Sequence, residues 1–240
     1  RRPPRSTLSS SSAASDVYKR QLLFRRRIDM EYNPPTEPLD ILHEDAHILV
    51  VNKPAGLLSV PGKGIELADC LLSRLKIAFP NTLLVHRLDR DTSGVMIFGQ
   101  TEYAQRALSM QFERRQVKKT YVARVSGEVT QKSGLIDLPL VVDWENRPRQ
   151  MVCHETGKLA LTEWYKLSSN QNESRLRLVP KTGRSHQLRV HCMALGHPIL
   201  GDPIYGEVST HHRMMLHSEE LRVKHPENGF GSRFRSKAPF

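Results

Sequence analysis

The chain has 240 residues, of which 38 % are hydrophobic and 25 % charged, and its formal net charge is +11. This length can bury one large core, and no stretch approaches the roughly 18–20 consecutive apolar residues of a membrane-spanning helix, so we exclude a spanning protein. Three widely separated cysteines without a CxxC pair argue against a disulfide framework and a thiolate metal site, and they indicate a reducing, cytoplasmic setting. They are Cys70, Cys153 and Cys192.

Residues 1–29 differ in composition from the rest of the chain. They hold eight basic and two acidic side chains, so a modest surplus of +5 remains on residues 30–240, compatible with a polyanionic partner. The stretch STLSSSSAAS (6–15) has no apolar periodicity, and residues 22–24 are too few for the apolar core of a secretory signal. A transit peptide and a flexible RNA-binding arm both fit this composition, but we expect a disordered arm that is not native to the folded protein. We expect one folded domain over residues 30–240.

From Met30 onward, strands and helices are mixed. Runs that are apolar or that alternate between apolar and polar residues predict strands at 41–42, 47–51, 95–98, 119–125 and 174–179. Amphipathic spacing predicts helices at 67–79, 103–115 and 185–195, the last capped by Ser185 and closed by Gly196. Because strands and helices do not alternate regularly, the pattern favours an α+β fold with a mixed sheet over a doubly wound fold.

The densest polar cluster is HRLDRDTSG (86–94). Its Asp89 stands between Arg87 and Arg90, which should lower the pKa of the carboxyl group. An aspartate that stays ionised suits a nucleophile or a stabiliser of positive charge. The alternative is a surface turn in which Asp89 caps the backbone and the arginines are solvated.

A second cluster, KTGRSHQLRVH (181–191), is rich in the types of side chain that proteins use to contact RNA phosphates and base edges. A solvated basic helix start would look the same. His186 and His191 are five residues apart, a spacing that suits neither one helix face nor one strand face, so we predict no metal site. Tyr121 lies in the basic strand KKTYVAR, where it could stack on a splayed-out base or simply pack. Lys53 could contact phosphate or cap a turn.

At HRLDRDTSG the chain resembles the catalytic motif of the RluA-type pseudouridine synthases. Further blocks of resemblance follow in the family's order. They are ILVVNKPAGLLSVPG (48–62), HRLDRDTSGVMIF (86–98), KKTYVARVSG (118–127), TGRSHQLRVHCMALGHPILGDPIYG (182–206) and LHSEEL (216–221). The resemblance implies a mixed, mainly antiparallel sheet flanked by helices and loops, with a central active-site cleft. We expect no S4-like domain of the kind that precedes the catalytic domain in several relatives.

The resemblance also implies roles for individual residues. Asp89 would be the essential aspartate, which acts on a flipped uridine either by attacking the ribose C1′ or through a glycal route. Arg189 would pair with Asp89, and Tyr121 would stack on the uracil or help remove the C5 proton. The implied contacts with RNA are the following: Arg87, filling the space left by the flipped base; Leu188, packing on the uracil; and Lys53 and Arg184.

Segment 134–164 resembles the members of this family that act on both 23S rRNA and tRNA, so we expect stem-loops of these two RNAs as partners. The resemblance implies no metal and no organic cofactor, and we expect a monomer. Two alternatives remain open: a sister synthase specific for another rRNA uridine, and a non-catalytic RNA-binding or ribosome-assembly factor.

Overall fold

The computed structural model describes residues 32–206 and 211–240. The chain separates into two compact units, 1–33 and 34–240, and the second unit contains every element described below. The arm predicted at residues 1–29 lies outside the described residues. Among the described helices, none is both long and apolar enough to cross a membrane.

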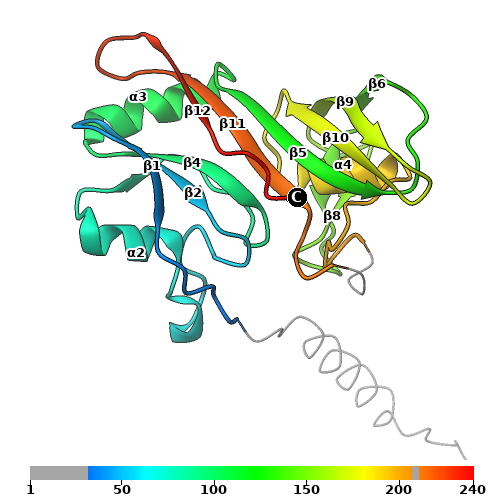
Figure 1. Cartoon of the computed structure of the whole chain (residues 1–240), viewed down its shortest axis with the longest axis horizontal. Helices are drawn as coiled ribbons and strands as arrows, with labels where there is room; N and C mark the ends of the chain where they lie inside the picture. The colour runs from blue at the N-terminus through cyan, green and yellow to red at the C-terminus, as the bar shows by residue number, and fades with distance from the viewer. Residues whose placement is uncertain (1–31, 207–210) are drawn as a thin grey trace, which may run out of the picture. The chain divides into compact units, whose positions relative to one another are not determined.

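A ten-stranded mixed sheet runs through the second unit (Figure 1). Eight of its strands follow one path in the order β1-β2-β4-β11-β5-β10-β9-β6, and β3 and β12 pair with β4 and β11. The strands of the sheet are β1 (Asp40–Glu44), β2 (Ile48–Lys53), β3 (Leu83–Leu84), β4 (Ser93–Gly99), β5 (Lys118–Ser126), β6 (Ser133–Asp137), β9 (Leu161–Ser169), β10 (Glu173–Pro180), β11 (Leu216–Lys224) and β12 (Gly231–Arg235). A separate pair consists of β7 (Leu140–Val142) and β8 (Gln150–Val152). The α+β class and the mixed, mainly antiparallel sheet predicted from the sequence are confirmed.

Helices cover both faces of the first half of the sheet. Alternate residues of β4 point to opposite faces, so Met96 and Phe98 join the core under α2 (Leu71–Ala78) while Val95 and Ile97 join the core under α3 (Glu102–Glu113). The prediction for α3 is confirmed to within two residues.

The helix predicted at 67–79 begins later, at Leu71. A short 3-10 turn, η1 (Ile65–Leu67), precedes it. Cys70 is the N-cap: its Sγ accepts the Ser73 amide, and the Ser73 hydroxyl accepts the Cys70 amide. This reciprocal capping box satisfies the first amides of the helix and sets its start.

In the second half of the sheet, α4 (Gln187–Ala194) covers the face that carries Ala123, Leu176 and Leu178. The predicted cap at Ser185 is wrong. His186 is the N-cap, in a left-handed conformation with φ of 52° and no side-chain capping bond. The predicted closure at Gly196 is confirmed, since its φ is +86° and its amide donates to Met193 O at 3.0 Å.

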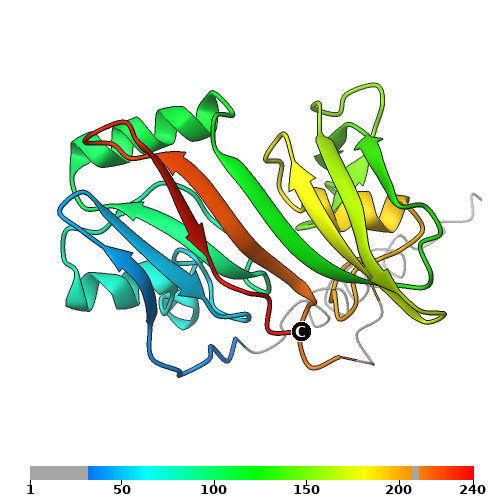
Figure 2. The same ribbon diagram turned by 45° about the horizontal axis from the view of Figure 1, so that its top comes forward.

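The two halves are joined by β11, which runs beside β5 across the molecule (Figure 2). On its other side β11 pairs in parallel with the start of β4. Gly94 permits this contact: its φ is +114°, and a Cβ there would lie 2.2 Å from the carbonyl oxygen of Ser218. Both the backbone angle and the closeness of the neighbouring strand therefore require glycine at this position.

Candidate active site

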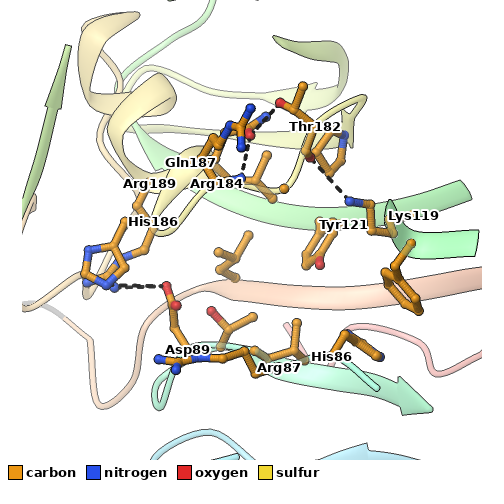
Figure 3. A pocket seen from close by; sticks show the side chains of 17 residues that line it. His86, Arg87, Asp89, Lys119, Tyr121, Thr182, Arg184, His186, Gln187 and Arg189 are labelled. Carbon is orange, nitrogen blue, oxygen red and sulfur yellow. Dashed lines mark hydrogen bonds and ion pairs between the residues drawn. The ribbon is translucent and has the colours of Figure 1, made fainter. Parts of the chain in front are cut away.

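A pocket of about 320 Å³ opens between the loop at 86–92, strand β5 and the start of α4 (Figure 3). Six of the seven site residues predicted from the sequence line it. They are Arg87, Asp89, Tyr121, Arg184, Leu188 and Arg189. The most distant of these residues, Arg87 and Arg189, lie 102 positions apart in the chain.

The seventh, Lys53, does not reach the pocket. It is fully buried, and its Nζ donates to the carbonyl oxygens of Pro54, Leu57 and Arg90 at 2.7–2.8 Å. Burial lowers the pKa of Lys53 to about 7, although the negative charges of Asp91 and Asp89 act in the opposite direction and raise it. The predicted RNA contact is wrong because a side chain enclosed by protein cannot touch a phosphate. Lys53 instead ties β2 to the loop that carries Asp89.

Other bonds fix the same loop. The hydroxyl of Ser59 donates to Leu88 O at 2.7 Å and accepts from the Leu88 amide, and the amide of Gly56 donates to Arg90 O at 2.9 Å. Because the residues on both sides of Asp89 are held by the core, its carboxylate is presented to the pocket from a rigid support.

His86 anchors the beginning of the loop. Its Nε2 accepts the amide of Ile97 at 3.1 Å, and its ring stacks on Phe112 with centroids 4.5 Å apart. Burial, with a smaller effect from Lys119, lowers the pKa of His86 to about 3. The imidazole is therefore neutral at pH 7, as its acceptor role requires.

The carboxylate of Asp89 pairs with a distant arginine instead of the arginines beside it in the chain. Arg189 Nη1 lies 3.1 Å from Asp89 Oδ2, whereas Arg90 turns to Asp91, with Nε 2.9 Å from Oδ1. Arg189 also forms two 2.7 Å bonds with the fully buried Asp202. Burial alone would lower the pKa of Arg189, but the bonds and charge of Asp202, followed by those of Asp89, outweigh burial and raise it. A fixed guanidinium thus faces one oxygen of Asp89.

A histidine also lies near the same oxygen of Asp89. His186 Nε2 lies 3.9 Å from Asp89 Oδ2, and His186 Nδ1 lies 2.8 Å from the hydroxyl of Tyr205. That hydroxyl accepts the amide of Gln150 at 2.7 Å. Burial lowers the pKa of His186, and this effect outweighs the opposing one of Asp89. The neutral imidazole is held edge-on by Tyr205 at the wall of the pocket.

Tyr121 and Leu188 supply the apolar surface of the pocket. Tyr121 lies on β5 opposite Leu178 of β10 and Ser218 of β11, so it occupies the centre of the sheet. Burial raises the pKa of Tyr121 to about 12, so the phenol is protonated at neutral pH. Leu188 is 7 % exposed. A planar ring that entered this pocket would meet an aromatic side chain and an aliphatic one.

The two remaining arginines lie at the mouth of the pocket. Arg87 is exposed, and Arg184 is partly exposed with its Nε bonded to Leu159 O at 3.0 Å. The backbone around Arg184 is fixed by Gln187, whose Oε1 accepts from the Arg184 amide at 3.0 Å and from the Thr182 hydroxyl at 2.7 Å. Arg87 can therefore reorient more freely than Arg184.

The described residues include no group of three or more His, Cys, Asp or Glu side chains arranged to hold a metal ion. His191 is buried and bonded to Thr162 Oγ1 at 2.9 Å and to Leu138 O at 3.0 Å. Its position is thus explained by packing between α4 and β9.

Sequence reasoning missed three residues that shape the site: Gln187, Asp202 and Tyr205. Asp202 follows Gly201 in GDPIYG, and its Oδ1 accepts the amides of Ile204 and Tyr205 at 2.9 and 3.1 Å. An aspartate at the head of a turn bounded by glycines was the available signal. Nothing local, however, indicated its partner Arg189.

Comparison with known proteins shows which family the chain belongs to. The sequence model of the family described as RNA pseudouridylate synthase matches residues 47–194. The chain is 50 % identical over 204 residues to the dual-specificity RNA pseudouridine synthase RluA of Yersinia pestis, covering 83 % of this chain and 99 % of the relative. It is 50 % identical to the RluA of Escherichia coli K12, covering 87 % and 98 %. The solved structure of human RNA pseudouridylate synthase domain containing 1 has 33 % identity and a TM-score of 0.71, with 87 % of each chain covered.

Proposed function

The chain belongs to the RNA pseudouridylate synthase family, and we propose that it isomerises one uridine in a 23S rRNA loop and one in a tRNA anticodon stem-loop. The enzyme class is that of RNA pseudouridine synthases, which convert uridine to pseudouridine in RNA. The dual choice of RNA is supported by the dual-specificity synthases of Yersinia pestis and Escherichia coli, which are 50 % identical to this chain.

The observation that carries the proposal is the Asp89–Arg189 pair at the wall of a pocket that also holds an aromatic ring. The target uridine leaves the RNA stack and enters this pocket, with its uracil against Tyr121 and Leu188. Unstacking a base costs a few kcal/mol, and Arg87 at the mouth offsets part of this cost by occupying the vacated place. Arg184 contacts the adjacent backbone.

Asp89 then acts at the ribose. In one route its Oδ attacks C1′ and the N1–C1′ bond breaks with its electron pair moving to uracil N1. In the other route the same bond breaks as a proton leaves C2′, which forms a glycal. After the uracil turns, its C5 bonds to C1′. In the first route the ester bond between Asp89 and C1′ breaks at this step, and in the second route the proton returns to C2′. The C5 proton is then lost, and N1 gains a proton. Atoms and electrons thus balance within the nucleotide.

Arg189 is a positioning residue in this scheme. Its two bonds to Asp202 fix the guanidinium, and its third bond orients the Asp89 carboxylate toward the nucleotide. Tyr121 presents its ring to the uracil, and Asp89 is close enough for its charge to contribute to the raised pKa of the Tyr121 hydroxyl.

The test is pseudouridine mapping by carbodiimide-stopped reverse transcription. Bulk tRNA and 23S rRNA are treated with the full chain, with Asp89→Ala, and with Asp91→Asn as the matched control. Asp91 is two residues away and pairs with Arg90, outside the pocket lining. We expect new stops in both RNAs with the wild type and the control and none with Asp89→Ala.

Other outcomes would change the proposal in defined ways. Stops in rRNA alone would indicate a related synthase that is specific for an rRNA uridine and does not act on tRNA. Stops produced by Asp89→Ala would remove Asp89 from the reaction. Tight RNA binding without stops from any of the three proteins would favour a non-catalytic RNA-binding role.

A further inference from the structure

A second, larger hollow of about 780 Å³ lies next to the active-site pocket. It is formed by the junction of α3 and β5, by β9 and β10, and by β11 and β12. The pocket and this hollow share Lys119 and Pro180 in their linings, so the two are continuous around the ends of β5 and β10. We call the larger hollow the arginine groove.

The arginine groove lies on the face of the sheet opposite α4. Leu176 and Leu178 of β10 point into the core beneath α4, whereas Arg177 and Val179, at the alternate positions, line the groove. On β5, Lys118 and Thr120 likewise alternate with Tyr121 and Ala123. The uncovered face of this half of the sheet is therefore charged.

The groove carries a strong positive excess. Its lining includes eight basic side chains and three acidic ones. The basic residues are Arg115, Lys118, Lys119, Arg177, Lys181, Arg222, Arg233 and Arg235; the acidic ones are Glu163, Glu219 and Glu220. A concave surface with a surplus of five positive charges attracts a polyanion.

The acidic residues leave part of this charge available. Lys181 Nζ lies 2.8 Å from Glu163, and Arg235 lies 3.6 Å from Glu219. Glu220 alone holds both Arg222 and Arg233, with Nε distances of 2.6 and 2.7 Å, so one carboxylate organises two guanidinium groups. Each of these arginines keeps further N–H groups for an external acceptor.

Three exposed residues complete the surface. Arg115, Lys118 and Arg177 form no ion pair within the described part of the chain. The guanidinium of Arg177 instead lies 4.8 Å from the ring centroid of Tyr165. An arginine layered on an aromatic ring offers both a charge for a phosphate and a flat surface for an unpaired base.

We propose that the arginine groove binds the RNA strand that flanks the flipped uridine, holding its phosphates on the face of the sheet opposite α4. The strand leaves the active-site pocket beside Lys119, whose Nζ donates to Thr182 O at 3.3 Å, and continues over Lys118 and Arg177. The groove thus lengthens the contact with RNA beyond the nucleotide that reacts. This inference rests on the proposed function for the identity of its ligand.

The experiment compares two triple variants that remove the same charge. Arg115→Ala/Lys118→Ala/Arg177→Ala changes the groove. Lys63→Ala/Lys76→Ala/Lys132→Ala removes three exposed lysines outside it. Binding of bulk tRNA is measured by filter retention from 50 to 300 mM salt, and isomerisation is mapped in the same samples.

We expect the groove variant to bind tRNA about tenfold more weakly at low salt, with the slope of log K against log salt reduced by about 2, since each lost phosphate contact contributes about 0.7. Its KM should rise accordingly. The control variant should bind like the wild type. Equal affinities and equal salt slopes for the two variants would contradict the proposal that the arginine groove binds RNA.

The outcome is separable from that of the proposed function. If the wild type binds tRNA through the groove but yields no pseudouridine, the proposal that the groove binds RNA is supported and the proposed isomerisation is contradicted. If the wild type yields pseudouridine and both variants bind tRNA equally, the proposed isomerisation is supported and the proposal that the groove binds RNA is contradicted.

Discussion

Arg189 gives two of its guanidinium nitrogens, Nε and Nη2, to the two oxygens of Asp202 and keeps Nη1 for Asp89. Asp202 is fully buried and Arg189 is 2 % exposed, so neither charge can turn to water instead. The orientation of the Asp89 carboxylate therefore depends on an aspartate 113 positions further along the chain.

Replacing Asp202 should damage both stability and activity. In Asp202→Asn the buried guanidinium of Arg189 loses its buried countercharge and one of the two oxygens that Asp202 offers, which should lower the free energy of unfolding by about 3–5 kcal/mol. Urea denaturation measures this loss, and carbodiimide mapping measures the accompanying fall in isomerisation. The control is Asp69→Asn. It breaks the exposed pair with Arg74, and about 1 kcal/mol or less should be lost. An Asp202→Asn protein as stable and active as the wild type would show that Arg189 needs no support.

The ring and the hydroxyl of Tyr121 can be tested separately. Tyr121→Phe keeps the aromatic face, so RNA affinity should stay within about threefold of the wild type, while Tyr121→Leu should lose about 1–3 kcal/mol of binding. If the hydroxyl takes part in moving the C5 proton, Tyr121→Phe should lower the rate at saturating RNA by about 10²–10⁴-fold. Single-turnover release of tritium from uridine labelled at C5 gives this rate. A full rate for Tyr121→Phe would restrict Tyr121 to stacking.

His86 should make the fold sensitive to acid. Its pKa is about 3 in the folded protein against about 6.5 when unfolded, so the unfolded state binds the extra proton first as the pH falls. The contribution of His86 is complete above pH 6.5 and is lost as the pH drops toward 3. His86→Gln keeps an acceptor for the Ile97 amide without a titrating ring, and its unfolding free energy should decline less across this window. The exposed His154, replaced by Gln, serves as the control; an unchanged acid slope in His86→Gln would refute the assignment.

Lys53 distinguishes support of the loop from contact with RNA. Lys53→Met fills the same space but leaves three carbonyl oxygens without their donor, which should cost about 2–4 kcal/mol of unfolding free energy. The salt dependence of RNA binding should not change, because Lys53 is fully buried. A reduced salt slope with wild-type stability would restore the RNA contact expected from the sequence.

Local patterns predicted the short elements well and the long-range pairings poorly. The closure of α4 at Gly196 was predictable because glycine readily adopts the positive φ, here +86°, that ends a helix. The partner of Asp89 was not predictable from spacing, which suggested Arg87 and Arg90. Only the family resemblance indicated Arg189.

Strand β11 was missed for a related reason. Its first half, Leu216–Ser218, is buried without alternation and contains two polar residues, and only its last four residues, LRVK, alternate between buried and exposed. Glu220 is buried there because Arg222 and Arg233 flank it. The sequence of β11 alone does not reveal this pairing of charges, because Arg233 belongs to β12.

The position of β11 also sets the order in which the protein can be completed. It lies between β4 and β5, yet it is formed by residues 216–224. While a ribosome is still translating the residues before 216, β1, β2 and β4 have no strand to join them to β5, β10 and β9. The loop that carries Asp89 then adjoins one piece of sheet, and α4, which carries Arg189, adjoins the other. A chain released before this strand would contain both residues of the pair and no site, so catalytic competence requires residues 216–224 to have been synthesised.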